Sequence, residues 1–379
     1  MSDVEKVSPR INPHMKIFLN ITVVLFTSLI LSMGAQAQDG AAQVDGLYVN
    51  TIGPHKMSFG KAASQVIFAQ QKDKTPSQPI PLRQLDVSSL DVVQGPVLFR
   101  LGHSSILLKL GDDLVLIDPV FSKRASPLQW LGPKRFHPVP LAVDQLPEIT
   151  AVVISHNHYD HLDKGTVRQL ADRVDHFVVP LGVGAHLQDW GVDADSIIEM
   201  DWWEELEIGE LTFVATPAQH FSGRSLTDRN ETLWASWVIQ GDGANLFFSG
   251  DSGYFDGFKE IGERYGPFDL TMVENGAYND AWRTVHMMPE ESVQAHIDLQ
   301  GRAMLPIHNS TFDLSTHSWY DPLERVNALA AERGIQLVTP VIGAPVQVLS
   351  PQPTFAWWRG EEEMVAAGDA AGEACERAC

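Results

Sequence analysis

The stretch Ser155-His156-Asn157-His158-Tyr159-Asp160-His161-Leu162-Asp163 places three histidines and one aspartate within positions 156–161. It follows the apolar run 149–154, which predicts a buried strand ending at the cluster. His156 and His158 are two residues apart, so extended backbone would point both imidazoles to the same side. Imidazole and carboxylate groups bind zinc and harder divalent metals. The stretch therefore predicts half of a site for two metal ions.

The other half must come from distant parts of the chain, because one such cluster cannot fill the coordination of two ions. His220, Asp251 and His308 each follow a separate apolar run that predicts a strand. Ligands at strand ends on a rigid sheet edge are how α/β folds build sites. The two cysteines, Cys375 and Cys379, lie far from the histidines in the sequence, so no thiolate ligand is expected.

Strands and helices alternate in a way that predicts an α/β fold with two packed sheets and helices outside. We expect a signal peptide or N-terminal anchor at 1–37, a lead-in segment at 38–94, the main domain at 95–350 and an acidic tail at 351–379. The predicted strands cover 97–101, 105–110, 114–117, 149–154, 176–180, 211–215, 234–240, 246–249, 270–273, 304–307 and 336–339. The predicted helices cover 164–171, 184–190, 289–299 and 322–333.

The N-terminus has the form of an export signal. Met15-Lys16 precedes the uncharged apolar run 17–33, and Ala35-Gln36-Ala37 then offers small residues two apart. The run is slightly shorter than the roughly 20 residues of a spanning helix, and an uncleaved membrane anchor is the alternative. We expect a periplasmic or secreted protein, or a membrane-anchored one if the segment is retained.

Composition limits the partners. The 379 residues are 44% hydrophobic and carry a formal net charge of −21, which disfavours nucleic acid and, in general, anionic membrane surfaces. We expect a small-molecule or lipid substrate and no nucleic acid, and membrane association is possible through that substrate or an uncleaved N-terminal segment. The sequence does not indicate an oligomeric state. The long loop 121–140, with Trp130 and Phe136, is of a length typical of functional loops.

The chain resembles the metallo-β-lactamase-fold hydrolases, whose His-x-His-x-Asp-His signature stands at 156–161. Within them it is most similar to the branch of N-acyl-phosphatidylethanolamine-hydrolysing phospholipase D and its bacterial relatives. Besides 155–163, the matching segments are Leu-Gly-His-Ser-Ser at 101–105, Ile-Asp-Pro-Val-Phe-Ser at 117–122, Gly-Pro-Lys-Arg-Phe at 132–136, Pro-Ala-Gln-His at 217–220, Ser-Gly-Asp-Ser-Gly-Tyr at 249–254, Gly-Pro-Phe-Asp-Leu at 266–270, Gly-Ala-Tyr at 276–278, His286, Pro-Glu-Glu at 289–291, Ile-His at 307–308 and Thr-Phe at 311–312.

This resemblance implies a four-layer αβ/βα sandwich with the site at one edge of two mixed sheets. It assigns His156, His158 and His220 to one metal, Asp160, His161 and His308 to the other, and Asp251 to a bridging position. Zinc is the expected metal, and manganese or iron is compatible with the same ligands. Two ions about 3.5–4 Å apart activate a bridging water as hydroxide, which Asp160 would help to orient.

His286 has no ligand role in this scheme. A histidine before Pro-Glu-Glu lines the active site in the phospholipase branch, so we expect His286 to contact the substrate or to protonate the leaving group. A structural histidine is the alternative. Tyr278 and Trp282 are expected walls of the substrate pocket. His103 and Asp118 match family positions near the site and are expected to orient ligands or to pack against them.

The sequence thus predicts an exported dinuclear-metal hydrolase whose hydroxide attacks a phosphodiester, with an N-acyl phospholipid as the candidate substrate. The alternative is a lactonase or other cyclic ester or amide hydrolase of the same fold. A metal-binding protein without turnover is disfavoured because Asp251 and His286 fit a working site. Val273-Glu274-Asn275-Gly276 departs from the more apolar Ile-Pro-Ile-Gly of the phospholipase, which bears on the substrate and not on the metal chemistry.

Overall fold

The computed structural model describes residues 40–53 and 73–360, and the structural statements below concern these residues. The expected export signal, most of the acidic tail and both cysteines lie outside this part. In the described part, no helix combines the length and the apolar character needed to cross a bilayer.

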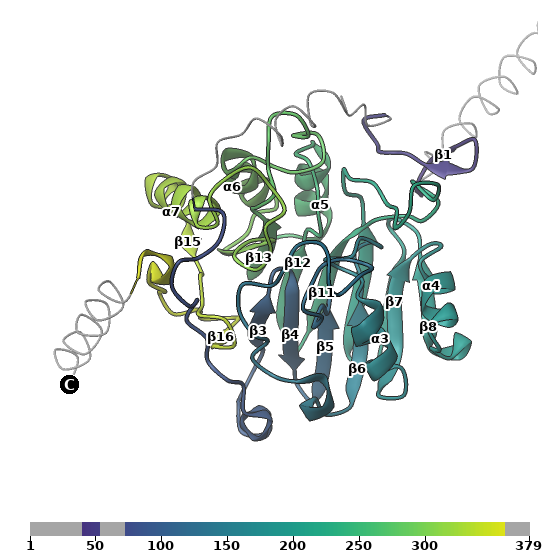
Figure 1. The fold of residues 1–379 in the computed structure, drawn as a ribbon, viewed down its shortest axis with the longest axis horizontal. Coiled ribbons are helices and arrows are strands. Elements are labelled where there is room, and N and C mark those ends of the chain that lie inside the picture. Colours follow the sequence, from purple (N-terminus) through teal and green to yellow (C-terminus); the bar gives the residue numbers. More distant parts are fainter. Residues whose placement is uncertain (1–39, 54–72, 361–379) are drawn as a thin grey trace, which may run out of the picture. The chain divides into compact units, whose positions relative to one another are not determined.

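Two seven-stranded sheets form the body of the main domain (Figure 1). The first sheet has the order β16-β3-β4-β5-β6-β7-β8, and the second has the order β15-β14-β13-β12-β11-β10-β9. In these orders, the first sheet consists of Pro345–Gln347, Val97–Gly102, Ser105–Leu110, Asp113–Ile117, Ile149–Val153, Val174–Pro180 and Ile197–Met200. The second consists of Gln336–Leu337, Ala303–Ile307, Leu270–Glu274, Ala244–Phe248, Ser236–Gly241, Leu211–Thr216 and Glu205–Ile208.

Both sheets are mixed. Strands β5 to β8 pair in parallel, as do β12 to β15, and the remaining neighbours are antiparallel. The helices, in chain order, are α3 (Lys164–Leu170), α4 (Gly184–Asp189), α5 (Gly257–Tyr265), α6 (Pro289–Asp298) and α7 (Asp321–Arg333). Short elements complete the described part: β1 (Gln43–Val44), β2 (Leu47–Tyr48), and the 3-10 turns Val87–Asp91, Val143–Gln145, Ala194–Ser196 and Trp357–Arg359.

The strands alternate their side chains between two apolar layers, as a period of two requires. In β6, Ala151 and Val153 join the core between the sheets, whereas Val152 joins the layer under α3 and α4. The outer face of the second sheet packs against α5, α6 and α7 through residues such as Phe258 and Val293. The order helix, sheet, sheet, helix confirms the predicted αβ/βα sandwich.

Local signals explain where the helices next to the histidine stretch begin and end. Asp163 closes that stretch and caps α3, since its carboxylate accepts a hydrogen bond from Gly165 N at 3.0 Å. Helix α6 begins at Pro289, and Glu291 accepts a bond from Met288 N at 2.9 Å. The histidine stretch therefore lies between the end of β6 and the capped start of α3.

Candidate metal centre

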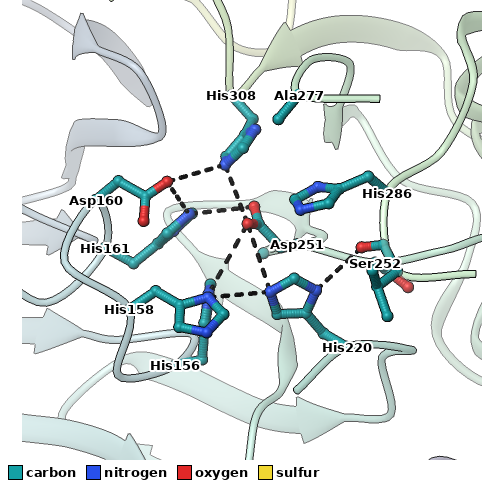
Figure 2. Close-up of polar contacts among 12 residues, drawn as sticks. His156, His158, Asp160, His161, His220, Asp251, Ser252, Ala277, His286 and His308 are labelled. Carbon is teal, nitrogen blue, oxygen red and sulfur yellow. Dashed lines mark hydrogen bonds and ion pairs between the residues drawn. The ribbon is translucent and has the colours of Figure 1, made fainter. Parts of the chain in front are cut away.

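The expected ligands meet where strands of both sheets end. His156, His220, Asp251 and His308 follow the ends of β6, β10, β12 and β14, respectively. Figure 2 shows His156, His158 and His220 on one side of Asp251, and Asp160, His161 and His308 on the other. The structure thus brings together all seven residues that the sequence singled out as metal ligands.

The first cluster consists of three imidazoles and Asp251. His158 Nδ1 lies 2.8 Å from His156 Nε2 and 3.2 Å from His220 Nε2. Asp251 Oδ2 lies 3.8 Å from His156 Nε2 and 3.7 Å from His220 Nε2. Two nitrogens bound to one tetrahedral zinc ion would be roughly 3.3 Å apart, given Zn–N bonds of about 2.0–2.1 Å. The spacing of the four donor atoms therefore fits one metal ion.

The second cluster lies on the other side of Asp251. Asp160 Oδ2 is 3.2 Å from His308 Nε2 and 3.6 Å from His161 Nε2. Asp251 reaches this cluster as well, with Oδ1 at 3.2 Å from His161 Nε2 and Oδ2 at 3.0 Å from His308 Nε2. A carboxylate placed between two sets of donors is the arrangement expected of a ligand shared by two ions.

Hydrogen bonds behind the rings hold them toward the centre. His161 Nδ1 pairs with Asp118 Oδ2 at 2.7 Å, and His220 Nδ1 pairs with the Val285 carbonyl at 3.0 Å. Each contact leaves Nε2 as the nitrogen that faces the other ligands. Within the described residues, His161 Nε2 and Asp251 Oδ1 are buried and face each other at 3.2 Å, yet neither atom makes a hydrogen bond. Buried polar atoms rarely lack a partner, and a metal ion held by these atoms would satisfy both.

The protonation of the rings also suits a cation. Burial lowers the pKa of His156 and His220 well below the usual value, so both are neutral, which is the state that binds a metal. Burial also opposes charge on His308, but Asp251 and Asp160 raise its pKa to about 10. The carboxylates therefore draw positive charge to the second cluster, and a divalent ion supplies that charge when it replaces the proton.

His103 contacts the second cluster directly through the carboxylate of Asp160. Its Nε2 is 3.1 Å from Asp160 Oδ2, and its side chain is almost fully buried. Burial lowers the pKa of His103 to about 3, so the neutral ring can donate its Nε2 proton to the Asp160 carboxylate. His103 thus orients a ligand, which matches the role expected from its position in the sequence.

His286 stands beside the centre and pairs with Glu274, the last residue of β13. Glu274 is fully buried; its carboxylate accepts one hydrogen bond from His286 Nδ1 and another from Ser252 N at 2.6 Å. Because Nδ1 is occupied, Nε2 is the nitrogen of His286 that is left to face the centre, near Asp251 and His308 (Figure 2). Sequence reasoning noted Glu274 only as a departure from the phospholipase and missed this pairing.

A cleft of about 230 Å³ opens over the expected metal ligands. Its described lining combines His158, Asp160, Asp251, His286 and His308 with the apolar side Phe221, Ala277, Trp282, Val285 and Leu314. Trp282 therefore lies where a pocket wall was expected. Tyr278 does not line the described cleft: it is 4% exposed, its hydroxyl donates to Asp321, and it lies one residue beyond Ala277. Its expected contact with the substrate would thus be indirect.

The lead-in segment contributes one residue that the sequence did not indicate. Asn50 is buried against His220: its amide donates to the His220 carbonyl at 2.9 Å, and its oxygen accepts from His220 N at 2.9 Å. This two-way bond fixes the backbone of a ligand from a segment 170 positions earlier. A lone asparagine in the lead-in segment carries no sequence signal for such a role.

Comparisons with known proteins agree with this geometry. A family model described as "Beta-lactamase superfamily domain" matches residues 114–309. An uncharacterized protein of Mycobacterium tuberculosis is 42% identical over 336 residues, which cover 86% of this chain and 90% of that protein. N-acyl-phosphatidylethanolamine-hydrolyzing phospholipase D 1 of Caenorhabditis elegans is 33% identical over 268 residues, which cover 67% of this chain and 75% of that protein.

A solved structure supports the fold. Igni18, a metallo hydrolase from the archaeon Ignicoccus hospitalis, matches with a TM-score of 0.51 at 18% identity, covering 67% of this chain and 98% of its own. The two mixed sheets, the two histidine and aspartate clusters at their edge, and these matches lead to one conclusion: the chain belongs to the metallo-β-lactamase superfamily of metal-dependent hydrolases.

Proposed function

We propose that this chain is an exported hydrolase that uses two divalent metal ions, with zinc as the first candidate, to cleave a phosphodiester. An N-acyl phospholipid is the candidate substrate. The observation that carries the proposal is the position of Asp251 between two donor clusters, with the Glu274–His286 pair beside them. The phospholipase D of Caenorhabditis elegans, similar over two thirds of this chain, supports the choice of substrate.

When bound, the two ions would supply an activated water and a positive field for the phosphate. Asp160 and Asp251 both line the cleft, but the Asp160 side chain is the more exposed of the two (14% against 2%), which supports Asp160 as the residue that orients that water. His286 Nε2 is placed to donate a proton to the leaving oxygen, because Glu274 holds the opposite ring nitrogen. Phe221, Trp282 and Leu314 form an apolar wall suited to the organic part of the ester.

Hydrolysis of a lactone or another cyclic ester or amide is the second candidate. The departure at Glu274 favours it, since this carboxylate stands beside the cleft where the phospholipase sequence is apolar. The same metal ligands serve both reactions. The two candidates therefore differ in the electrophile that fits between His286 and the apolar wall.

Metal analysis joined to an activity panel tests the proposal. The purified protein should bind two ions per chain and hydrolyse phosphodiesters, N-acyl phospholipids included, with lactones as the comparison. Asp251→Asn serves as a metal-deficient control on the same preparation. Turnover of lactones alone would replace the first candidate with the second. Two bound ions without turnover of any ester, lactone or phosphodiester would contradict the enzyme proposal as a whole.

The proposal of export has its own test. If the signal is cleaved after Ala37, the protein recovered from its native cells should begin at Gln38. A chain that begins at Met1 or Met15 and stays in the membrane fraction would instead support the retained anchor.

A further inference from the structure

The loop that follows β5 carries a group of large apolar side chains in contact with water. Leu128 is 43% exposed, Trp130 is 74% exposed and Leu131 is 57% exposed. Together these three residues form what we call the apolar tip. Three such side chains within four positions expose a large apolar area to water, which is unfavourable unless another surface covers it.

Hydrogen bonds hold the tip in this outward position. Arg124 and Lys134 pair as an antiparallel bridge at the base of the loop, and Ala125 N donates to the Pro133 carbonyl at 3.1 Å. Inside the loop, Gln129 accepts from Arg124 N at 3.1 Å and donates back to the Arg124 carbonyl at 3.1 Å. The polar groups of the loop thus bond to one another, and the apolar side chains remain outside.

The loop is positively charged in a strongly acidic protein. No aspartate or glutamate occurs between Asp118 and Asp144, whereas Lys123, Arg124, Lys134 and Arg135 fall in this interval of a chain with net charge −21. Lys123 and Lys134 are exposed on the two sides of the loop base. The general repulsion of anionic surfaces expected from composition is therefore reversed locally at this loop.

The base of the loop adjoins the metal centre. Phe136 N donates to the Thr311 carbonyl at 2.9 Å, three residues after the ligand His308. Phe136 lines a hollow of about 500 Å³ together with Lys134, and it lines a second, narrower hollow together with His308. The base of the loop thus lies next to the segment that carries His308.

We propose that this loop docks the protein on an anionic lipid bilayer. The apolar tip enters the membrane interface, where tryptophan is favoured, and Lys123 and Lys134 contact the headgroups. The loop offers apolar side chains to the membrane interface and cationic side chains to the anionic headgroups, so it matches the bilayer in both respects. The inference rests on the proposed function for the use of the docking, because a phospholipid substrate resides in a bilayer. The docking itself does not depend on which bond is cleaved.

Hydrogen–deuterium exchange of the full chain tests the docking at the loop itself, because the apolar run 17–33 can bind lipid independently. Vesicles of phosphatidylcholine mixed with phosphatidylglycerol should slow exchange at residues 126–132, and vesicles of phosphatidylcholine alone should do so much less. High salt should weaken the effect. Unchanged exchange at 126–132 with both vesicle types would overturn the proposal and leave a protein surface as the cover of the tip.

Matched variants separate the loop from the rest of the surface. Leu131→Ser should lower vesicle binding through the loop by about tenfold or more, whereas Leu349→Ser, at a similarly exposed leucine (54%), should not. Lys123→Gln with Lys134→Gln should lower it by roughly tenfold, whereas Lys259→Gln on α5 should not. The lysine pair lies on the surface, so it tests the proposal even if the tip variant folds poorly. Equal effects of loop and control variants would contradict the proposal.

A water-soluble phosphodiester distinguishes this proposal from the proposed function. Loop variants should cleave it like the unmodified protein and lose turnover only on vesicle-borne lipid. Slowed exchange without any phosphodiester cleavage would keep the docking and reject the phosphodiesterase. Equal loss on soluble and vesicle-borne substrates would reject a docking role for the loop.

Discussion

The buried carboxylate of Glu274 accepts a hydrogen bond from Nδ1 of His286, next to a metal centre in which neither residue is an expected ligand. Burial raises the pKa of Glu274, and the imidazole is the polar side chain that compensates for its desolvation. The same carboxylate accepts from Ser252 N, one residue after Asp251. Glu274 therefore connects the ring that faces the cleft to the backbone of the shared ligand.

Glu274→Gln should lower turnover while the metal content stays near two ions per chain. Glutamine keeps the shape but can no longer hold the His286 ring as a charged acceptor does, so we expect kcat to fall roughly 10–100-fold. Metal analysis and steady-state kinetics on one preparation check this. Glu290→Gln, at an exposed glutamate paired with Arg325, is the matched control and should leave both values unchanged. A large loss of metal in Glu274→Gln would show that the residue supports the ligands and not His286.

His286→Ala should keep both metal ions and lower kcat by roughly 10²–10⁴, the usual contribution of a positioned acid or base. Glu274 holds Nδ1 of His286, which leaves Nε2 of this ring for the cleft. The six other described histidines of the centre are expected ligands or, for His103, the partner of Asp160. His176→Ala, on β7 away from the centre, controls for loss of a histidine. If His286→Ala loses an ion, the residue is a ligand, as its distance to Asp251 and His308 also permits.

Substitutions of the ligands should differ in the number of ions that they remove. Asp251 touches both clusters, so Asp251→Asn should reduce binding of both ions, whereas His220→Ala should reduce the first ion and leave the second. Elemental analysis after dialysis measures the stoichiometry directly. Loss of both ions in each variant would mean that the two positions fill cooperatively, and full retention in Asp251→Asn would reject its shared position.

Much of the architecture could be predicted because strong patterns and tertiary packing agree. Strand β4 occupies the predicted residues 105–110, where every apolar side chain is buried. Helix α5 was not predicted, since it contains Gly257 and Gly262, and glycine weakens the helix signal. Packing explains the second glycine: a Cβ at Gly262 would clash with the Asp298 carbonyl at the end of α6. Gly262 thus fits the contact with α6, and the same residue weakens the sequence signal for helix α5.

In the metal centre too, features with a strong sequence pattern could be predicted, and features set by tertiary contacts could not. The convergence of the expected ligands could be predicted because each follows an apolar run that ends at one edge of the sheets. The strands β8 and β9 were missed because they are half-exposed edge strands with glutamates, such as Glu199 and Glu205. The contacts of Asn50 with His220 and of Glu274 with His286 depend on how loops fold back over the sheet edge, and no periodicity records that.

Asp118→Asn should weaken binding of the second ion without removing a ligand. Asp118 lies at the end of β5, fully buried, and its carboxylate accepts from His161 Nδ1 at 2.7 Å, from Ser155 N at 2.7 Å and from Ser155 Oγ at 2.6 Å. An asparagine can offer only one acceptor oxygen, and its amide would face a donor on one side. We expect the ring of His161 to turn or change tautomer, and metal affinity to fall roughly 10–100-fold.

Competition with a chromophoric chelator measures this affinity, and Asp144→Asn, on the surface at the far end of the same loop, is the control. Excess metal should restore turnover in Asp118→Asn, because every ligand of the centre is still present. If turnover stays low at saturating metal, Asp118 acts on the reaction itself and not through the orientation of His161.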